Sequence, residues 1–231
     1  MNRVEQQNCF ILKSQAYKET SSIHQVFTRD YGVISVISKG SRAKNSKNGS
    51  LLQSFRPLLF SWVGKGELKT LTTVEESFSI GQLKAIPLYC GFYVNELMLS
   101  LLHKHDAHPV LFKSFETVIV QLSEANNIEA NLRQFEKALL DETGYGLALD
   151  NEALTGLAIS TDQHYVYRPG EGALLENNAA HPDAISGSAL INLRLNQLTD
   201  KNELAQVKRL MRKLIDVQLD GKMLKSREFF K

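Results

Sequence analysis

The chain has few of the features that build disulfide frameworks, zinc knuckles or membrane spans. Its 231 residues include two cysteines, Cys9 and Cys90, which are too few for a disulfide framework or a four-cysteine metal site. No uninterrupted apolar run reaches the roughly 18 residues that a membrane span needs. Residues 1–10 lack the basic-then-apolar layout of a signal peptide. We therefore expect a cytoplasmic protein without a membrane partner.

Motifs for common catalytic chemistry are also missing. The sequence contains no GxxxxGK[ST] string, so it gives no case for ATP hydrolysis, and no GxSxG nucleophile elbow. The pair Gly170 and Gly172 lacks the third glycine of a dinucleotide-binding fingerprint. These absences predict that the protein is not an enzyme and needs no cofactor.

One histidine string could suggest a metal-dependent hydrolase. His103, His105 and His108 lie close together in sequence, with Asp106 between them. In a helix, positions i, i+2 and i+5 do not converge on one face, and histidine is also favoured at helix ends by the dipole. We therefore interpret these histidines as residues at a helix end and not as metal ligands, and we expect no bound metal.

Charge is distributed unevenly along the chain. The formal net charge of +2 conceals +6 in residues 39–69, −10 in residues 70–206 and +5 in residues 207–231. Basic blocks of this kind are typical of polyanion-binding proteins, although solvated surface and an acidic protein partner are alternatives. Two hypotheses follow: a protein that binds DNA, and a protein-interaction adaptor that does not bind DNA. The predicted DNA-binding residues are Lys39, Arg42, Lys44, Lys47, Arg56, Lys65, Lys69, Lys208, Arg212, Lys225 and Arg227.

The first 75 or so residues favour β-structure. Five short apolar runs, at 10–17, 22–28, 33–39, 56–63 and 67–74, predict a small barrel, because closing a five-stranded sheet removes its exposed edges. Residues 39–50 are rich in Gly, Ser, Asn and Lys and predict a mobile loop.

An OB-type barrel binds nucleic acid with a charged groove and aromatic faces. The nearby aromatic residues are Tyr31, Phe55, Phe60 and Trp62. Phe60 is favoured as core, whereas Trp62 and Tyr31 suit either environment.

From about residue 85 the apolar period becomes helical. Helices are predicted over 85–102, 109–122, 129–144 and 200–219, with Phe92 and Val110 among their apolar positions. Pro87, Gly144 and Asp200 supply start and stop signals. Residues 145–185 favour irregular structure, with a short hairpin at 165–176. The predicted fold class is α+β, with a β domain at 1–80, a helical domain at 81–231 and a boundary near 76–84.

Ordered strings over nearly the whole chain resemble one family. These strings are KETSSIHQVFTRDYGVISVISKGSRAK, SLLQSFRPLLFSWVGKGELKTL, LYCGFYVNELM, LRQFEKALLDETGYGL and GKMLKSREFF. Together they resemble the RecO DNA-repair proteins of the gammaproteobacterial type. The resemblance implies an N-terminal OB-fold, a helical C-terminal domain and a nucleoid-associated location. It also implies a recombination mediator that binds single- and double-stranded DNA and anneals complementary strands. With RecR, such a mediator helps to load RecA onto DNA coated with single-strand binding protein.

The resemblance has two further implications. In the family, the arginine of the LR-x-FE string holds the C-terminal tail of single-strand binding protein, and it corresponds to Arg133 here. Leu132 and Phe135 would line that pocket, although their helical spacing makes them equally good core residues. Many RecO proteins also carry a four-cysteine zinc site in the C-terminal domain. Residues 145–185 contain no cysteine, so the zinc-less branch of the family is the better match.

Overall fold

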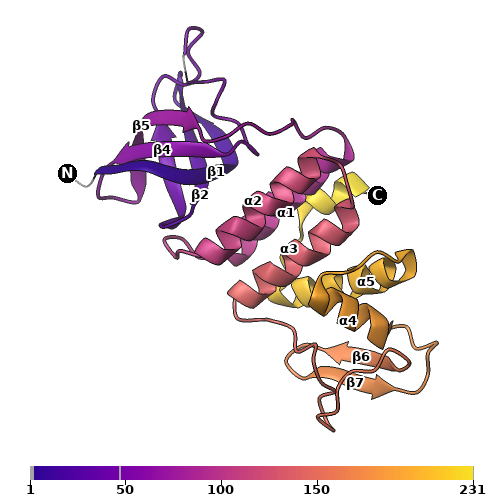
Figure 1. The fold of residues 1–231 in the computed structure, drawn as a ribbon. Helices are drawn as coiled ribbons and strands as arrows, with labels where there is room; N and C mark the ends of the chain where they lie inside the picture. The colour runs from indigo at the N-terminus through magenta and orange to yellow at the C-terminus, as the bar shows by residue number, and fades with distance from the viewer. Residues whose placement is uncertain (1–2, 47, 231) are drawn as a thin grey trace. The chain divides into compact units, whose positions relative to one another are not determined.

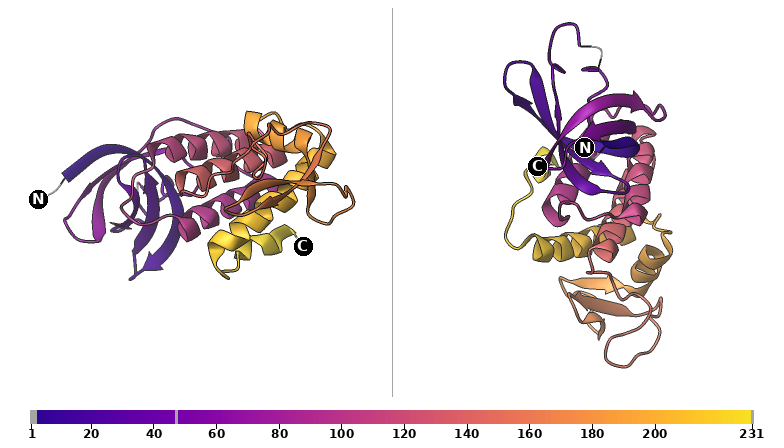
Figure 2. Two further views of the ribbon diagram at one scale, coloured as in Figure 1. Left: turned by 90° about the horizontal axis from the view of Figure 1, so that it is seen from below. Right: turned by 90° about the vertical axis from the view of Figure 1, so that its left-hand side faces the viewer.

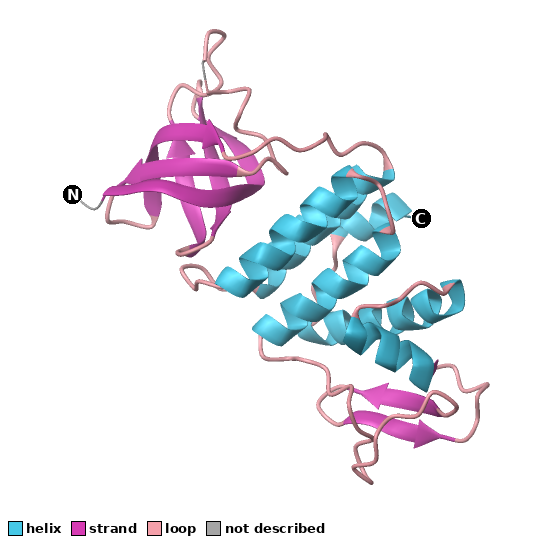
Figure 3. Ribbon diagram, viewed as in Figure 1, coloured by secondary structure: helices cyan, strands magenta, loops and turns pink. Residues whose placement is uncertain are grey.

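The computed structural model describes residues 3–46 and 48–230, and the chain divides into two compact units. The first unit runs to Ala125 and resumes at Leu224, and the second comprises Asn126–Met223. The strands form two separate sheets, one in each unit (Figure 3). None of the helices in the described part of the chain combines the length and apolarity that a membrane span requires.

A closed five-stranded barrel forms the N-terminal part of the first unit (Figure 1). Its order is β1-β2-β3-β5-β4, with β1 pairing back to β4; only β3 and β5 are parallel. The predicted five-stranded barrel is thereby confirmed. The strands are β1 (Arg3–Tyr17), β2 (Ser21–Thr28), β3 (Gly32–Ser38), β4 (Leu58–Val63) and β5 (Leu68–Glu76).

The barrel interior explains why this sequence closes. One buried cluster joins Ile11, Val26, Val36, Phe60 and Trp62 from four of the strands. β-branched and aromatic side chains fit such a pleated, buried surface well. The expectation that Phe60 is core is confirmed, since it is fully buried. β1 begins earlier than predicted, because its polar start at Arg3 pairs with Val63 at the end of β4.

Two helices of the first unit follow the barrel, α1 (Ile86–Leu101) and α2 (Pro109–Ser123). α2 packs on the barrel through Phe112 and Phe115, whose ring centroids lie 5.1–5.9 Å from those of Phe10 and Phe27. α1 is tied to β1 by the Asn95 amide, which donates to the Leu12 carbonyl at 2.9 Å.

The predicted apolar faces of these two helices were partly wrong. Phe92 is 40% exposed, because the buried face of α1 includes Leu97, which was expected, together with Cys90 and Val94. Val110 is also exposed, because it lies in the first turn of α2, ahead of the residues that pack on the barrel. Pro87 occupies the first turn of α1, as expected.

The chain returns to the first unit at its C-terminus. A 3₁₀ helix, η1 (Lys225–Phe230), packs on α1. The Glu96 carboxylate accepts hydrogen bonds from the backbone N–H groups of Lys225 (2.9 Å) and Ser226 (2.8 Å), and from the Ser226 hydroxyl (2.6 Å). This segment is coloured yellow at the C-terminal label in both views of Figure 2.

The second unit packs three helices with a small sheet of order β7-β6-β8. The predicted 165–176 hairpin is confirmed as β6 and β7, and Asp200 caps α5 as expected. β8 and α4 were not predicted. The elements are α3 (Ile128–Glu142), β6 (His164–Arg168), β7 (Gly172–Glu176), β8 (Ala184–Ser186), α4 (Gly187–Leu195) and α5 (Lys201–Leu219).

The compact units divide the helices differently from the boundary expected near residues 76–84. The structure groups α1 and α2 with the barrel and places the division after Ala125. Two units that are compactly packed need not be the parts of the chain that fold independently. The domain division at 80/81 therefore stays a prediction.

Candidate nucleic-acid interface

The loop between β3 and β4 carries the densest group of predicted DNA-binding residues. Lys39 and Lys44 are exposed on it, and the loop stands out from the barrel (Figures 1 and 2). Lys47 lies outside the described residues. The Arg42 N–H donates to the Thr20 carbonyl at 2.8 Å, which ties the loop to the β1–β2 turn.

That contact brings Lys18 to the same place, although the sequence pattern did not single it out. The Arg42 guanidinium donates to the carbonyls of Lys18 (3.3 Å) and Glu19 (2.5 Å). Only strand pairing places the turn after β1 beside a loop more than 20 residues away, so local sequence carries no signal for it. We call Lys18, Lys39, Arg42 and Lys44 the loop patch. Within residues 3–46 and 48–230, none of the four has a carboxylate oxygen within 4 Å.

Lys65 and Lys69 are not part of this patch. Lys65 is exposed in the turn from β4 to β5, and Arg3 pairs with Val63 beside that turn, at the start of β1. The loop patch lies at the other end of β1, a 15-residue strand that would span on the order of 45 Å if straight. Lys69 is half-buried on β5, opposite Val36. Lys65 therefore lies apart from the loop patch, whereas Lys69 is opposite a residue only three positions before Lys39.

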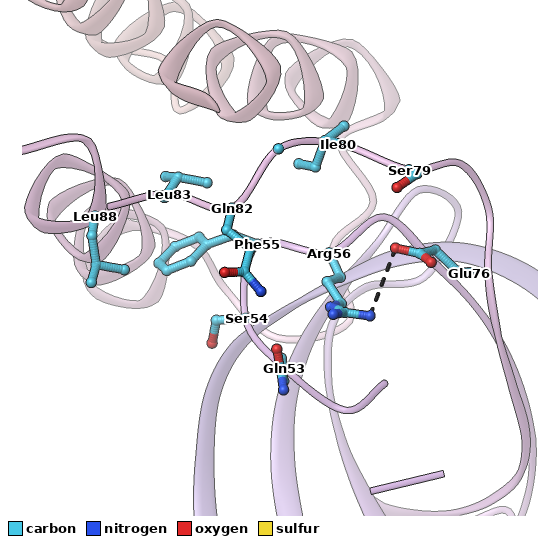
Figure 4. A pocket seen from close by; sticks show the side chains of 11 residues that line it. Gln53, Ser54, Phe55, Arg56, Glu76, Ser79, Ile80, Gln82, Leu83 and Leu88 are labelled. Carbon is cyan, nitrogen blue, oxygen red and sulfur yellow. Dashed lines mark ion pairs between the residues drawn. The ribbon is translucent and has the colours of Figure 1, made fainter. Parts of the chain in front are cut away.

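Arg56 lies in a pocket of about 490 Å³ between the loop before β4 and the segment that leads to α1 (Figure 4). Its Nη1 is 3.8 Å from a carboxylate oxygen of Glu76, beyond hydrogen-bonding distance. Gln53, Ser54 and Gln82 supply amides and a hydroxyl at the pocket, and Phe55, Leu83 and Leu88 supply apolar walls. Arg56 is thus half-buried and faces a partly polar cavity.

The remaining predicted cations lie in two places. Lys208 and Arg212 are exposed on α5 in the second unit, and Lys208 pairs with Glu129 at 2.6 Å. Lys225 and Arg227 belong to η1 in the first unit, where Lys225 is exposed and Arg227 is half-buried.

The sequence does not decide whether Trp62 and Tyr31 lie in the core or at the surface. In the structure, one lies in each place. Trp62 is 2% exposed and belongs to the barrel cluster. Tyr31 is 42% exposed and contacts Trp62 edge-on, with ring centroids 5.3 Å apart. Tyr31 is the one of the two whose ring a nucleobase can reach without opening the barrel.

Arg133, the candidate for binding the tail of single-strand binding protein, is buried on α3 together with Leu132 and Phe135. Its Nη2 donates to Glu136 Oε1 at 2.6 Å, one helical turn along, and Glu136 is fully buried. These contacts describe a buried ion pair within α3.

The histidine string is dispersed. His105 contacts Glu67 of the β4–β5 turn at 2.9 Å, and His108 lies 3.4 Å from Asp106. No group of three or more potential metal ligands lies together among the residues that the structure describes.

One further histidine is buried in the barrel and contributes no charge to the interface at neutral pH. His24 lies between the hydroxyls of Ser14 (2.7 Å) and Ser38 (2.8 Å). Burial lowers the pKa of His24 to about 4, because desolvation penalises its charged form.

Comparisons with known proteins match both halves of the chain. The family model described as "Recombination protein O N terminal" matches residues 1–78, and "Recombination protein O C terminal" matches residues 85–228. A "DNA repair protein RecO" of Methylococcus capsulatus is 39% identical over 230 residues, covering 100% of this chain and 94% of that protein. A protein of the same name from Dechloromonas aromatica is 36% identical over 234 residues, covering 100% and 96%.

Proposed function

The chain belongs to the RecO family of non-enzymatic recombination mediators, and from that premise we propose that it binds DNA and anneals complementary strands. With RecR, it helps to load RecA onto DNA coated with single-strand binding protein. It acts in the bacterial cytoplasm, at the nucleoid.

The observation that carries the DNA-binding part is the loop patch. Four cations from two separate segments lie together on the barrel, without a carboxylate within 4 Å among the described residues. Lysine and arginine in such an arrangement contact phosphates, which carry no sequence information. The binding is therefore nonspecific and sensitive to salt.

Strand annealing tests the activity itself. Complementary strands coated with single-strand binding protein are mixed with the protein and no nucleotide, and formation of duplex is followed by fluorescence. We expect annealing without ATP. A strict need for ATP, or no binding to short single-stranded and duplex DNA in a gel shift, contradicts the proposal, and the latter result favours the adaptor hypothesis.

Removing charge from the loop tests the assignment of the interface. Lys39, Arg42, Lys44 and Lys47 are replaced together by Gln, and the affinity for DNA is measured over a range of salt concentrations. The slope of log affinity against log salt falls by about 0.7 to 0.9 for each phosphate that the variant no longer neutralises. An unchanged slope means that this loop does not bind DNA.

We further propose that Arg133, with Leu132 and Phe135, receives the tail of single-strand binding protein. A tail of acidic residues ending in phenylalanine needs a cation beside an apolar pocket, and α3 supplies both residue types. Because Arg133 is 5% exposed, the tail must displace the side chains that cover it. Calorimetry with a tail peptide tests this: a double variant, Arg133→Met with Glu136→Met, loses peptide binding and keeps DNA binding. Equal peptide affinity in the variant rejects the site.

The chain also fits the zinc-less branch of the family. Both cysteines are buried in the first unit, and residues 145–185 contain none. Elemental analysis of the purified protein is expected to find far less than one zinc ion per chain, and stoichiometric zinc refutes this assignment.

A further inference from the structure

Five aromatic rings form a continuous row on the first unit. They are contributed by the loop before β4, by α1 and by η1, and we call Phe55, Tyr89, Phe92, Phe229 and Phe230 the ring row. Tyr89 stacks on Phe229, with ring centroids 5.0 Å apart and an interplanar angle of 21°. Phe92 contacts Phe229 (6.5 Å) and Phe55 (5.3 Å), and Phe230 meets Tyr89 edge-on at 6.5 Å.

Four of these rings are open to solvent. Tyr89 and Phe92 are about two-fifths exposed, and Phe229 and Phe230 about half exposed. Exposed apolar rings that touch one another mark a binding surface more often than scattered single residues do. Phe92 packs in this row and not in the core.

The row is held in place by specific contacts. The three hydrogen bonds to Glu96 fix the start of η1, and Leu224, just before it, is buried. Burial raises the pKa of the Glu96 carboxyl, but these hydrogen bonds outweigh it and the net pKa is lowered. At Gly91 an added Cβ would lie 2.8 Å from the Phe55 ring, so the glycine permits that ring to rest on α1.

The Phe55 end of the row opens into the 490 Å³ pocket (Figure 4). Pockets of this size accept a small-molecule ligand. The amides of Gln53 and Gln82 and the Ser54 hydroxyl offer both donors and acceptors there, as the edge of a nucleobase requires. Phe55 therefore connects a row of rings to a polar cavity.

The charges beside the row suit a polyanion. Lys84, just before α1, and Lys225 on η1 are exposed, and Arg227 adds a third cation. Glu96, the one acid of α1, is engaged by η1, and Glu76 faces Arg56 in the pocket. Glu228 is the acid of η1 itself and is exposed. Aromatic rings flanked by cations are how proteins hold single-stranded nucleic acid, because every unpaired base offers a face for stacking.

We propose that the ring row is a binding site for unpaired bases of single-stranded DNA, with the pocket receiving a base at its Phe55 end. This inference rests on the proposed function and deepens it. The loop patch holds phosphates of either DNA form, whereas the ring row distinguishes single strands, because bases in a duplex are already stacked and paired.

Two single variants, Tyr89→Leu and Phe229→Leu, test the site, with Tyr145→Leu as the matched control on an exposed ring of the second unit. The probes are a fluorescent oligothymidylate and a duplex of equal length. Each ring-row variant is expected to lower affinity for the single strand by roughly fivefold or more, the effect of losing one stacked base. Affinity for the duplex and the salt slope for both probes stay as in the parent, because stacking releases no counterions.

Crosslinking provides a second readout that does not depend on affinity. Single-stranded DNA carrying 5-iododeoxyuridine is irradiated with the full-length protein, and the crosslinked peptide is identified by mass spectrometry. We expect crosslinks within residues 53–56, 85–92 or 226–230. Crosslinks confined to other segments overturn the ring row, and so does an equal loss of single-strand and duplex affinity in the variants.

The outcomes separate this inference from the proposed function. If the parent protein binds neither probe, the proposed function itself fails. If the parent binds both probes and the variants bind like Tyr145→Leu, only the ring row is rejected. If the variants instead change the sedimentation coefficient and leave both affinities intact, the row is an interface between copies of this chain, and the base-binding proposal is wrong.

Discussion

The cations of the loop patch and three paired cations of the second unit have different partners. In the second unit, Lys208 pairs with Glu129 (2.6 Å), Lys213 with Asp183 (2.8 Å) and Arg194 with Asp150 (2.6 Å). In the first unit, the loop patch contacts backbone carbonyls through Arg42 and the Tyr17 ring through Lys18. Lysines of the two basic segments thus differ: those of α5 pair with carboxylates, and those of the loop patch have no carboxylate oxygen within 4 Å among the described residues.

The interiors of the two units differ in a related way. The barrel buries His24 in its neutral form, whereas α3 buries Arg133 as half of an ion pair. A neutral imidazole between two hydroxyls needs no counter-charge, but a guanidinium cannot lose its proton and requires one. The second unit therefore depends on a charge pair that the barrel does not need, and this contrast can be tested by mutation.

The largest expected effect is on the buried pair. Arg133→Met leaves the Glu136 carboxylate buried without the guanidinium, which costs about 3–5 kcal/mol of unfolding free energy. Urea denaturation measures the loss, with Arg212→Met on exposed α5 as the control, expected within about 0.5 kcal/mol of the parent. A loss below about 1 kcal/mol for Arg133→Met contradicts a structural role for the pair and leaves Arg133 available to the tail peptide.

The second effect concerns pH and the barrel. The pKa of His24 is about 4 in the folded protein and 6.5 in the unfolded chain, so the unfolded state binds the proton first as pH falls. The histidine's contribution to stability is complete above pH 6.5 and is lost progressively down to pH 4. The loss is on the order of 3 kcal/mol.

Replacing His24 checks that assignment. In His24→Gln, the stability of the protein should depend less steeply on pH between 6.5 and 4 than it does in the parent, whatever its absolute value. His103→Gln, at an exposed position, should keep the parent's pH dependence. If both variants follow the parent curve, the acid sensitivity arises elsewhere.

The third prediction compares the two basic segments directly with matched double variants. Lys39→Gln with Lys44→Gln removes two lysines without a carboxylate within 4 Å among the described residues, and Lys208→Gln with Lys213→Gln removes two ion-paired lysines. Each pair lowers the net charge by two. The first is expected to lower affinity for DNA about tenfold and to reduce the salt slope by about 1.4 to 1.8, for two phosphates no longer neutralised.

The helix pair, Lys208→Gln with Lys213→Gln, should change the salt slope by less than about 0.5, because Glu129 and Asp183 already neutralise these two lysines. Equal slopes for the two double variants would remove the distinction between the units and show that α5 contacts DNA as well. A larger change for the helix pair than for the loop pair would reverse the assignment.

The fold was predictable wherever the signal is local. Alternating apolar residues indicated the five strands, and Pro87, Gly144 and Asp200 marked helix ends that the structure confirms. α4 was missed because it is short and its apolar residues are spread around the helix, so its sequence lacks the periodicity that identifies an amphipathic helix. β8 was missed because three residues carry too little pattern.

The site was predictable only in part, because local sequence does not encode pairing between distant segments. The positions of Lys39 and Lys44 on an exposed loop followed from composition. The approach of Lys18 to Arg42 depends on the register of β1 with β2, and the separation of Lys65 from the loop depends on the length of β1. The ring row also depends on the return of η1 to α1, which no local pattern announces.

The smallest effect isolates stability from DNA binding in the second unit. The Asp200 carboxylate accepts from the N–H groups of Asn202 (2.8 Å) and Glu203 (3.0 Å), so Asp200→Ala should cost about 1 kcal/mol of unfolding free energy. Asp220→Asn at the opposite end of α5, where the side chain caps no N–H group in the described structure, is the control for loss of one acid, because asparagine tolerates the left-handed backbone at this position. If α5 serves only the fold, Asp200→Ala and Asp220→Asn have the same salt slope for DNA. A steeper slope in the uncapped variant alone would mean that fraying releases α5 cations to phosphate, so that the ion pairs of the second unit normally hold those cations back.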